Sequence, residues 1–152
     1  MDYAILNAEE RHLPQVERLE QVCFSVPWTE EQLRSQLPDN QHIFLVAECS
    51  GEVLGYVGLM YVLDEGYISN VAVSPERRRQ GIGEALIAEL TQRAARLGLA
   101  FLTLEVRASN DPAIRLYEKM HFRQVGRRKN YYQKPEEDAI LMTFFFNGGE
   151  TV

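Results

Sequence analysis

The sequence is poor in the residues that build metal sites and disulfides. Only two of its 152 residues are cysteine, Cys23 and Cys49, and they stand far apart in the chain. Two cysteines without a Cys-x-x-Cys spacing predict neither a zinc site nor a disulfide, so reduced, buried thiols are the simplest expectation. The three histidines, His12, His42 and His121, are dispersed and lack the spacing of metal ligands. We therefore expect no metal, and a protein of a reducing compartment.

The chain also lacks long apolar runs and an excess of positive charge. No apolar stretch reaches the roughly 18 residues that a membrane-spanning helix needs, and residues 1–4 do not begin a basic region followed by an apolar one. We therefore expect a cytoplasmic protein without a membrane partner. The formal net charge is −6, which argues against direct nucleic-acid binding because phosphate contacts require a basic face. An acidic surface instead favours a basic polypeptide as substrate.

The chain does have the composition and the pattern of one mixed domain. Hydrophobic residues make up 45% and charged residues 25%, which is typical of a globular protein. This pattern predicts an α+β fold in α/β/α layers, with a central, mostly antiparallel sheet flanked by helices. We expect a single domain over residues 1–146 and a flexible tail over 147–152. Strands are expected over residues 3–7, 43–47, 53–62, 67–73, 101–106 and 139–146, and helices over 13–23, 29–33, 84–97 and 112–120.

A basic, glycine-containing loop lies between a predicted strand and a predicted helix. It runs Arg78-Arg79-Gln80-Gly81-Ile82-Gly83, and apolar residues at helical spacing follow it until Gly98. Glycines let the backbone approach a ligand closely, and the free N–H groups of a helix N-terminus attract anions. The loop lacks the Gly-Lys-Ser/Thr of a P-loop and the spacing of the dinucleotide fingerprint. It predicts an anion-binding loop, for which an ordinary basic turn is the alternative.

This loop resembles the Arg/Gln-x-x-Gly-x-Gly/Ala pyrophosphate loop of the Gcn5-related N-acetyltransferases, the GNAT family. The resemblance implies the GNAT fold, with a twisted sheet, and acetyl-coenzyme A as co-substrate. It places the pantetheine arm along the backbone of the strand before the loop. It also gives Asn110 a hydrogen bond to the coenzyme, for which helix capping is the alternative. The coenzyme-binding residues that it implies are Val71, Ala72, Val73, Arg78, Arg79, Gln80, Gly81, Ile82, Gly83, Glu84 and Asn110.

Further segments resemble one branch of this family, the RimI-type ribosomal-protein-alanine N-acetyltransferases. This likeness extends from about residue 3 to about residue 146, and it implies transfer of an acetyl group to the N-terminal alanine of the eighteenth small-subunit ribosomal protein. An N-terminal acetyltransferase of broader peptide range, acetylation of a small amine, and acyl-coenzyme A sensing without catalysis are the alternatives. The segments are Pro27-Trp28, Leu104–Asn110, Ala113–Glu118, Asn130–Tyr132 and Glu137–Ile140.

The same resemblance implies two catalytic residues. Glu105 corresponds to the general base, and alternation along the strand 101–106 places it on the face opposite Leu104 and Val106. A carboxylate there is costly unless it is paired or used, so a salt bridge to Arg107 or Arg115 is the alternative. Tyr117 corresponds to the acid that protonates the departing thiolate, and a core-packing tyrosine is its alternative.

The peptide side of the site is implied less specifically. Trp28, Tyr131 and Tyr132 correspond to positions that line the peptide cleft, although aromatic residues at such positions are often part of a core. Two positions depart from the branch pattern: Lys129 is an extra residue after paired arginines, and His121 replaces the glycine that usually precedes Phe122. The first concerns the expected substrate rim, and the second concerns a turn.

Overall fold

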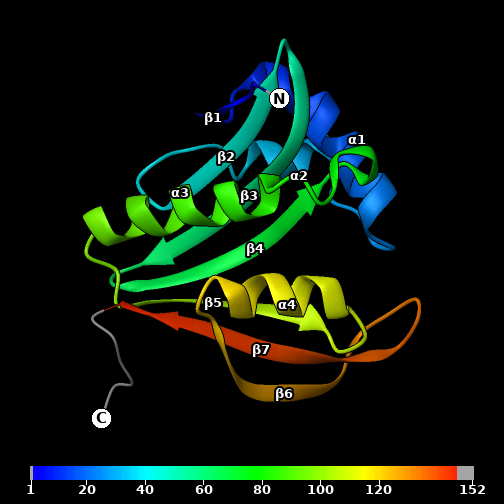
Figure 1. The fold of residues 1–152 in the computed structure, drawn as a ribbon, viewed down its shortest axis with the longest axis vertical. Helices are drawn as coiled ribbons and strands as arrows, with labels where there is room; N and C mark the ends of the chain where they lie inside the picture. Colours follow the sequence, from blue (N-terminus) through cyan, green and yellow to red (C-terminus); the bar gives the residue numbers. More distant parts are fainter. Residues whose placement is uncertain (1, 147–152) are drawn as a thin grey trace.

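The computed structural model describes residues 2–146, in which a seven-stranded sheet is flanked by helices (Figure 1). The predicted tail 147–152 lies outside the described residues. In chain order the elements are β1 (Ala4–Asn7), the short 3-10 helix η1 (Glu10–His12), α1 (Leu13–Cys23), α2 (Glu30–Arg34), β2 (His42–Cys49), β3 (Glu52–Val62), β4 (Glu65–Val73), the 3-10 helix η2 (Pro75–Arg77), α3 (Ile82–Arg96), β5 (Phe101–Arg107), α4 (Asp111–Lys119), β6 (Arg123–Tyr132) and β7 (Glu137–Phe145).

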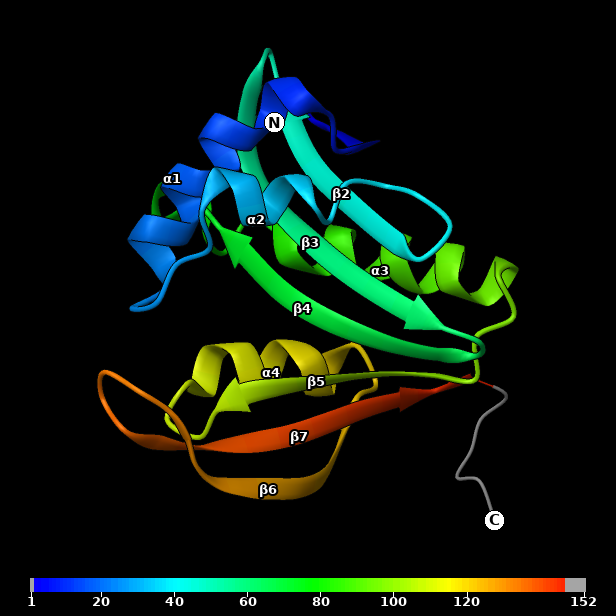
Figure 2. The same ribbon diagram turned by 180° about the vertical axis from the view of Figure 1, so that it is seen from behind.

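The sheet has the strand order β1-β2-β3-β4-β5-β7-β6, and its neighbours are antiparallel except for β4 and β5. These two parallel strands pair at three positions, where Glu65–Tyr67 lies beside Phe101–Thr103. Beyond these positions the strands separate, as both views of the ribbon show (Figures 1 and 2). The sheet is therefore divided between β4 and β5 along the parts of these two strands that follow Tyr67 and Thr103.

Helices cover both faces of the sheet. α1 and α2 lie on one face, and α3 and α4 lie on the other (Figures 1 and 2). Strand β2 shows why, because its side chains alternate between two apolar cores. Ile43 and Leu45 pack with residues of α3, whereas Phe44 and Val46 pack with residues of α1 and α2. The predicted α/β/α layering and the mostly antiparallel sheet are confirmed.

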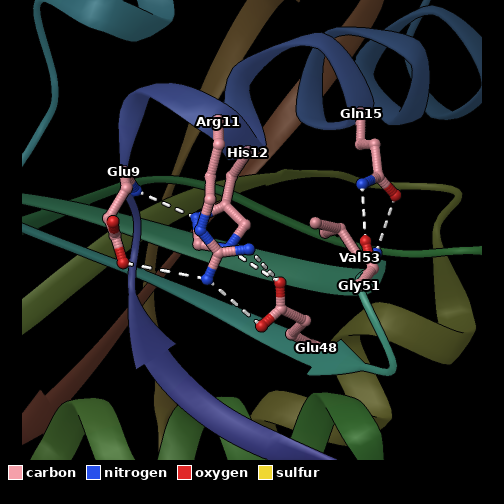
Figure 3. A network of polar contacts seen from close by, with 7 residues as sticks. All are labelled: Glu9, Arg11, His12, Gln15, Glu48, Gly51 and Val53. Carbon is pink, nitrogen blue, oxygen red and sulfur yellow. Dashed lines mark hydrogen bonds and ion pairs between the residues drawn. The ribbon is translucent and has the colours of Figure 1, made fainter.

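A polar network fixes the start of α1 on the hairpin of β2 and β3 (Figure 3). The His12 side chain is only 1% exposed, and its Nε2 lies 3.2 Å from Glu48 Oε2. Arg11 Nη1 donates to the same oxygen at 2.5 Å, and this guanidinium lowers the pKa of the Glu48 carboxyl. One turn later, the Gln15 amide oxygen accepts the Val53 N–H at 2.8 Å. The network therefore ties the start of α1 to β2 and β3.

The structure confirms several local predictions and corrects others. The spacing of Thr29 and Gln32 predicts a capping box, and the two residues form it at the start of α2. The structure has a strand, β6, over residues 123–132, where the sequence predicts none. The strand escapes prediction because it is polar and exposed along nearly its whole length. Asp111-Pro112 in the sequence predicts Asp111 as the N-cap of a helix, but Asn110 is the N-cap of α4, and its side chain accepts the Ala113 N–H at 3.3 Å.

The two cysteines, Cys23 and Cys49, are free, but each is half-buried rather than fully buried. None of the helices within residues 2–146 is long and apolar enough to cross a membrane.

Candidate active site

The first component of the site is the edge of β4 that faces the divided part of the sheet. Val71, Ala72 and Val73 pair with β3 on one side, and no pairing with β5 is present there within residues 2–146. Their side chains pack into the two cores, so the part of them that can meet a ligand is the backbone. The Val73 carbonyl accepts from Arg78 Nε at 3.4 Å. Ser69 falls at a register shift, which is typical of a β-bulge beside a functional site.

The second component is the N-terminus of α3. Gly81 is its N-cap, with φ of 80° and no side-chain cap, so the first-turn N–H groups lack a capping side chain. Arg79 also has a positive φ of 65°, a strained conformation that is common at functional loops. The Ile82 side chain is buried in the core, and a Cβ on Gly83 would lie 3.1 Å from Leu116 Cδ2. Gly83 therefore also allows α3 to pack closely against α4.

The loop side chains differ in their surroundings. Arg78, Arg79 and Gln80 are exposed. Glu84 forms an ion pair with Lys119 of α4, with 2.9 Å between oxygen and nitrogen. The side chain of Glu84 therefore links two helices, and only its backbone N–H belongs to the end of α3 that is expected to bind an anion.

Glu105 lies on β5, on the other side of the divided sheet. Its Oε2 forms an ion pair with Arg128 Nε of β6 at 3.0 Å, and the Glu105 side chain is 29% exposed. A salt bridge is the alternative role given to Glu105 above, and one is present. Its partner is Arg128, however, and not Arg107 or Arg115; Arg107 pairs with Glu137. Glu105 Oε1 makes no hydrogen bond within the described part of the chain, so this oxygen is available to accept a proton.

Tyr117 is 7% exposed, and its ring packs 5.8 Å from that of Phe122, so it does belong to the core. Its hydroxyl forms no hydrogen bond within residues 2–146, and it is not among the fully enclosed oxygens of that part of the chain, so at least a small part of it is exposed. Burial raises the pKa of Tyr117 above its ordinary value, so the hydroxyl keeps its proton at neutral pH.

Tyr132 connects the two catalytic candidates. Burial, followed by the charge of Glu105, raises the pKa of Tyr132 to about 12. Tyr132 in turn contributes to the raised pKa of Tyr117. Tyr132 therefore lies near both Glu105 and Tyr117. The family resemblance implies a place for Tyr132 in the peptide cleft, but no signal in the sequence indicates that it lies near both Glu105 and Tyr117.

Arg107 holds the segment that follows β6. Its guanidinium lies 4.5 Å from the centre of the Tyr132 ring and donates to the carbonyls of Gln133 and Pro135 at 2.7 and 2.9 Å. It also donates to Ser25 Oγ, in the segment between α1 and α2, at 3.2 Å. Tyr131 is exposed and meets Tyr132 edge to face, with 5.0 Å between ring centres. The two tyrosines therefore border the same end of the divided sheet as Glu105.

A buried carboxylate, Glu20 of α1, lies beneath the predicted peptide side. Its side chain accepts hydrogen bonds from the Trp28 N–H at 2.7 Å, from the Asn70 amide at 2.8 Å, and from the Tyr56 hydroxyl. Trp28 is half-buried against the core of α1 and α2. The sequence contained one signal for this site, since Glu20 is a carboxylate on the apolar face of a predicted helix. A small pocket adjoins this group, lined by Trp28, Leu33, Gln36, Phe44, Tyr56, Gly58, Ser69 and Asn70.

Comparison with known proteins identifies the family of this chain. The sequence model of the Acetyltransferase (GNAT) family matches residues 13–122. The chain belongs to the GNAT family. Both the fold and the enzyme class predicted from the sequence, an acyltransferase, are confirmed with it.

The chain is similar to a bacterial relative in sequence, to a bacterial crystal structure, and to a more distant plant structure. The [ribosomal protein bS18]-alanine N-acetyltransferase of Escherichia coli K12 is 37% identical over 140 residues, which cover 91% of this chain and 94% of that protein. The crystal structure of the Escherichia coli ribosomal-protein-S18-alanine N-acetyltransferase superposes with a TM-score of 0.88 and 34% identity, covering 99% of both chains. Arabidopsis thaliana NAA60, in complex with acetyl-CoA, shares the fold with a TM-score of 0.87 at 23% identity, covering 97% and 100% of the two chains.

The residues of this GNAT chain fit an acyl-coenzyme A. An open strand edge can pair with the amides of a pantetheine arm, and the α3 N-terminus with its exposed arginines suits a pyrophosphate. For a metal ion, residues 2–146 offer no group of three or more His, Cys, Asp or Glu side chains.

Proposed function

We propose that this protein is a peptide α-N-acetyltransferase that uses acetyl-coenzyme A and acts on the N-terminal alanine of ribosomal protein bS18. The curated Escherichia coli relative carries this activity in its name and matches nearly the whole chain. The observation that carries the proposal is the division between β4 and β5. It lies beside the α3 N-terminus and is bordered by Glu105 and Tyr132 at the same end of the sheet.

Acetyl-coenzyme A supplies the activated acetyl group, held along residues 71–73 and at residues 78–84. Glu105 acts as the general base, and it takes the proton of the α-amine through Oε1, directly or by way of a water. An α-amine has a pKa near ~8, so this proton is held loosely. Arg128 keeps the carboxylate in place through Oε2 and leaves the other oxygen for the amine.

Tyr117 acts as the acid. The amine nitrogen forms a bond to the acetyl carbon, the carbon–sulfur bond breaks, and the Tyr117 hydroxyl gives its proton to the departing sulfur. Burial raises the pKa of Tyr117, which keeps this proton in place until negative charge develops nearby. Tyr117 therefore contributes only moderately to the rate, because proton transfer from a phenol to a thiolate is uphill.

The peptide enters between Trp28 and the pair of Tyr131 and Tyr132. Its source, a ribosomal protein, places the reaction in the cytoplasm, and the net charge of −6 suits a basic substrate of this kind. Neither nucleic acid nor a membrane takes part in the reaction.

A panel of peptides that differ at the first residue tests the proposal, with release of the coenzyme thiol as the measurement. A peptide that begins with free alanine should react faster than one that begins with methionine followed by alanine. Equal rates on both peptides would instead indicate a broader N-terminal acetyltransferase. Turnover of a polyamine without turnover of any peptide would indicate a small-amine acetyltransferase, and no turnover at all would indicate an acyl-coenzyme A sensor.

A further inference from the structure

The segment between α1 and α2, residues 24–29, is fixed from both sides of the divided sheet. Near its start, Ser25 Oγ accepts from Arg107 of β5 at 3.2 Å. Near its end, the Trp28 N–H donates to Glu20 Oε1 at 2.7 Å, and the other oxygen of Glu20 accepts from Asn70 of β4 at 2.8 Å. The segment thus spans the place where β4 and β5 separate, with one attachment to each strand.

Glu20 is an unusual residue for this place. Its side chain is 0% exposed, and a buried carboxylate costs free energy unless several donors satisfy it. Three donors do so here, from the backbone of Trp28, the amide of Asn70 and the hydroxyl of Tyr56. A leucine would leave these three donors without their acceptor, so the carboxylate serves this polar cluster and not apolar packing.

We propose that Glu20 is a positioning residue for peptide recognition, which holds Trp28 against β4 so that the border of the peptide site keeps one shape. The same three partners, Trp28, Tyr56 and Asn70, line the small pocket that opens beside them. Asn70 directly precedes Val71, the first residue of the strand edge proposed for the acetyl donor. Through Glu20, the segment that meets the peptide is fixed relative to the strand that holds the acetyl group.

The same helix contains a matched control. One turn before Glu20, the Glu17 side chain accepts the Glu30 N–H at 2.7 Å and so ties α1 to the start of α2. The two contacts share their chemistry and their helix, but Glu17 does not reach the segment 24–29. An effect confined to Glu20 therefore reports on that segment rather than on α1 in general.

The test compares Glu20→Leu, Glu20→Asp and Glu20→Gln with Glu17→Leu. Leucine removes the acceptor, and aspartate draws the carboxyl back by one methylene, so both should raise the KM for an alanine-starting peptide by about tenfold or more, the equivalent of one lost hydrogen bond of about 1.4 kcal/mol. Glutamine keeps an acceptor for the Trp28 N–H and should stay within about threefold of wild type. For all variants, kcat and the acetyl-coenzyme A Kd from calorimetry should remain close to the wild-type values.

Fluorescence adds a readout that needs no substrate, because Trp28 is the only tryptophan in the chain. Glu20→Leu and Glu20→Asp should shift its emission to longer wavelength and make it more accessible to acrylamide, whereas Glu17→Leu should not. If Glu20→Leu does not fold, Glu20→Asp carries the same test with the carboxyl retained.

The possible results separate this inference from the proposed function, on which it rests. A wild-type enzyme that turns over no alanine-starting peptide overturns the proposed function, and the role of Glu20 in peptide recognition with it. Wild-type turnover together with an unchanged peptide KM in Glu20→Leu and Glu20→Asp overturns the role of Glu20 alone. A rise in KM for Glu20→Gln as large as that for Glu20→Leu would also overturn it, because charge and not the hydrogen bond would then be decisive.

Discussion

Replacing Glu20 with glutamine should change how the stability of this protein depends on pH. Burial is the main reason that the pKa of Glu20 rises from 4.5 to about 7, despite the opposing hydrogen bonds from Trp28 and Asn70. Glutamine resembles the protonated carboxyl in shape and carries no charge. The variant therefore shows what the protein would do if this one titration were absent.

The sign and the size of the effect follow from linkage. The folded protein binds the Glu20 proton more tightly than the unfolded chain does. This stabilisation is complete below a pH of about 4.5, decreases above it, and is lost once the pH passes about 7. A pKa difference of this size corresponds to about 3 kcal/mol at most, since each pKa unit contributes about 1.4 kcal/mol.

Urea unfolding of wild type and Glu20→Gln between pH 4.5 and 8.5 measures this effect. The free energy of unfolding of wild type, relative to the variant, should fall by about 2–3 kcal/mol across this range. Glu48 and Glu137 have lowered pKa values, titrate at lower pH and are present in both proteins, so their effects cancel. The charged or titratable neighbours of Glu20 are Tyr56, Cys23 and, beyond Cys23, Arg78, and they are also common to both. Parallel stability curves would refute the reasoning, because they would show that Glu20 titrates as an ordinary carboxyl.

Three further predictions concern the reaction and the backbone. Glu105→Gln should lower turnover by ~10²-fold at neutral pH, and the loss should shrink at high pH, where more of the α-amine is already deprotonated; Tyr117→Phe should also slow turnover but without this recovery. Nearly full activity of Glu105→Gln at neutral pH would make Glu105 a structural ion-pair residue. Replacing Arg78 and Arg79 together with alanine should weaken acetyl-coenzyme A binding by about tenfold or more in calorimetry, with little change in Tm, because both side chains are exposed; unchanged affinity would show that these two side chains do not hold the coenzyme. His121→Gly should stabilise the protein by up to about 1 kcal/mol in urea unfolding, because φ at His121 is 74°, and lower stability would show that the histidine side chain outweighs this strain.

Most of the fold and the motif residues could be predicted from the sequence, because their signals are local. Apolar periodicity marks α1 and α3, and the capping residues Thr29 and Gln32 mark α2. The glycine-containing loop and the block around Glu105 are short contiguous motifs, which a resemblance can identify without any knowledge of distant contacts.

The remainder depends on contacts between residues far apart in the chain. Strand β6 has no alternation of apolar and polar residues to reveal it, since nearly all of its side chains are exposed. The ion pair of Glu105 with Arg128 and the position of Tyr132 arise only after β6 and β7 have paired. The extra residue Lys129 lies in an irregular part of β6. The register with β7 shifts there, between Arg128 and Tyr132, and Asn130 adopts a positive φ of 53°.

The division between β4 and β5 gives this sheet an edge in its interior. Amide protons in the middle of a sheet normally exchange with solvent slowly, because large-scale opening must precede exchange. In the free protein, the β4 amides that point away from β3 within residues 71–73 should instead exchange at rates typical of an outer strand. The slowly exchanging amides then fall into two groups, one in β2 and β3 and one in β5 and β7. In exchange, the sheet therefore behaves as two half-sheets that share one apolar core.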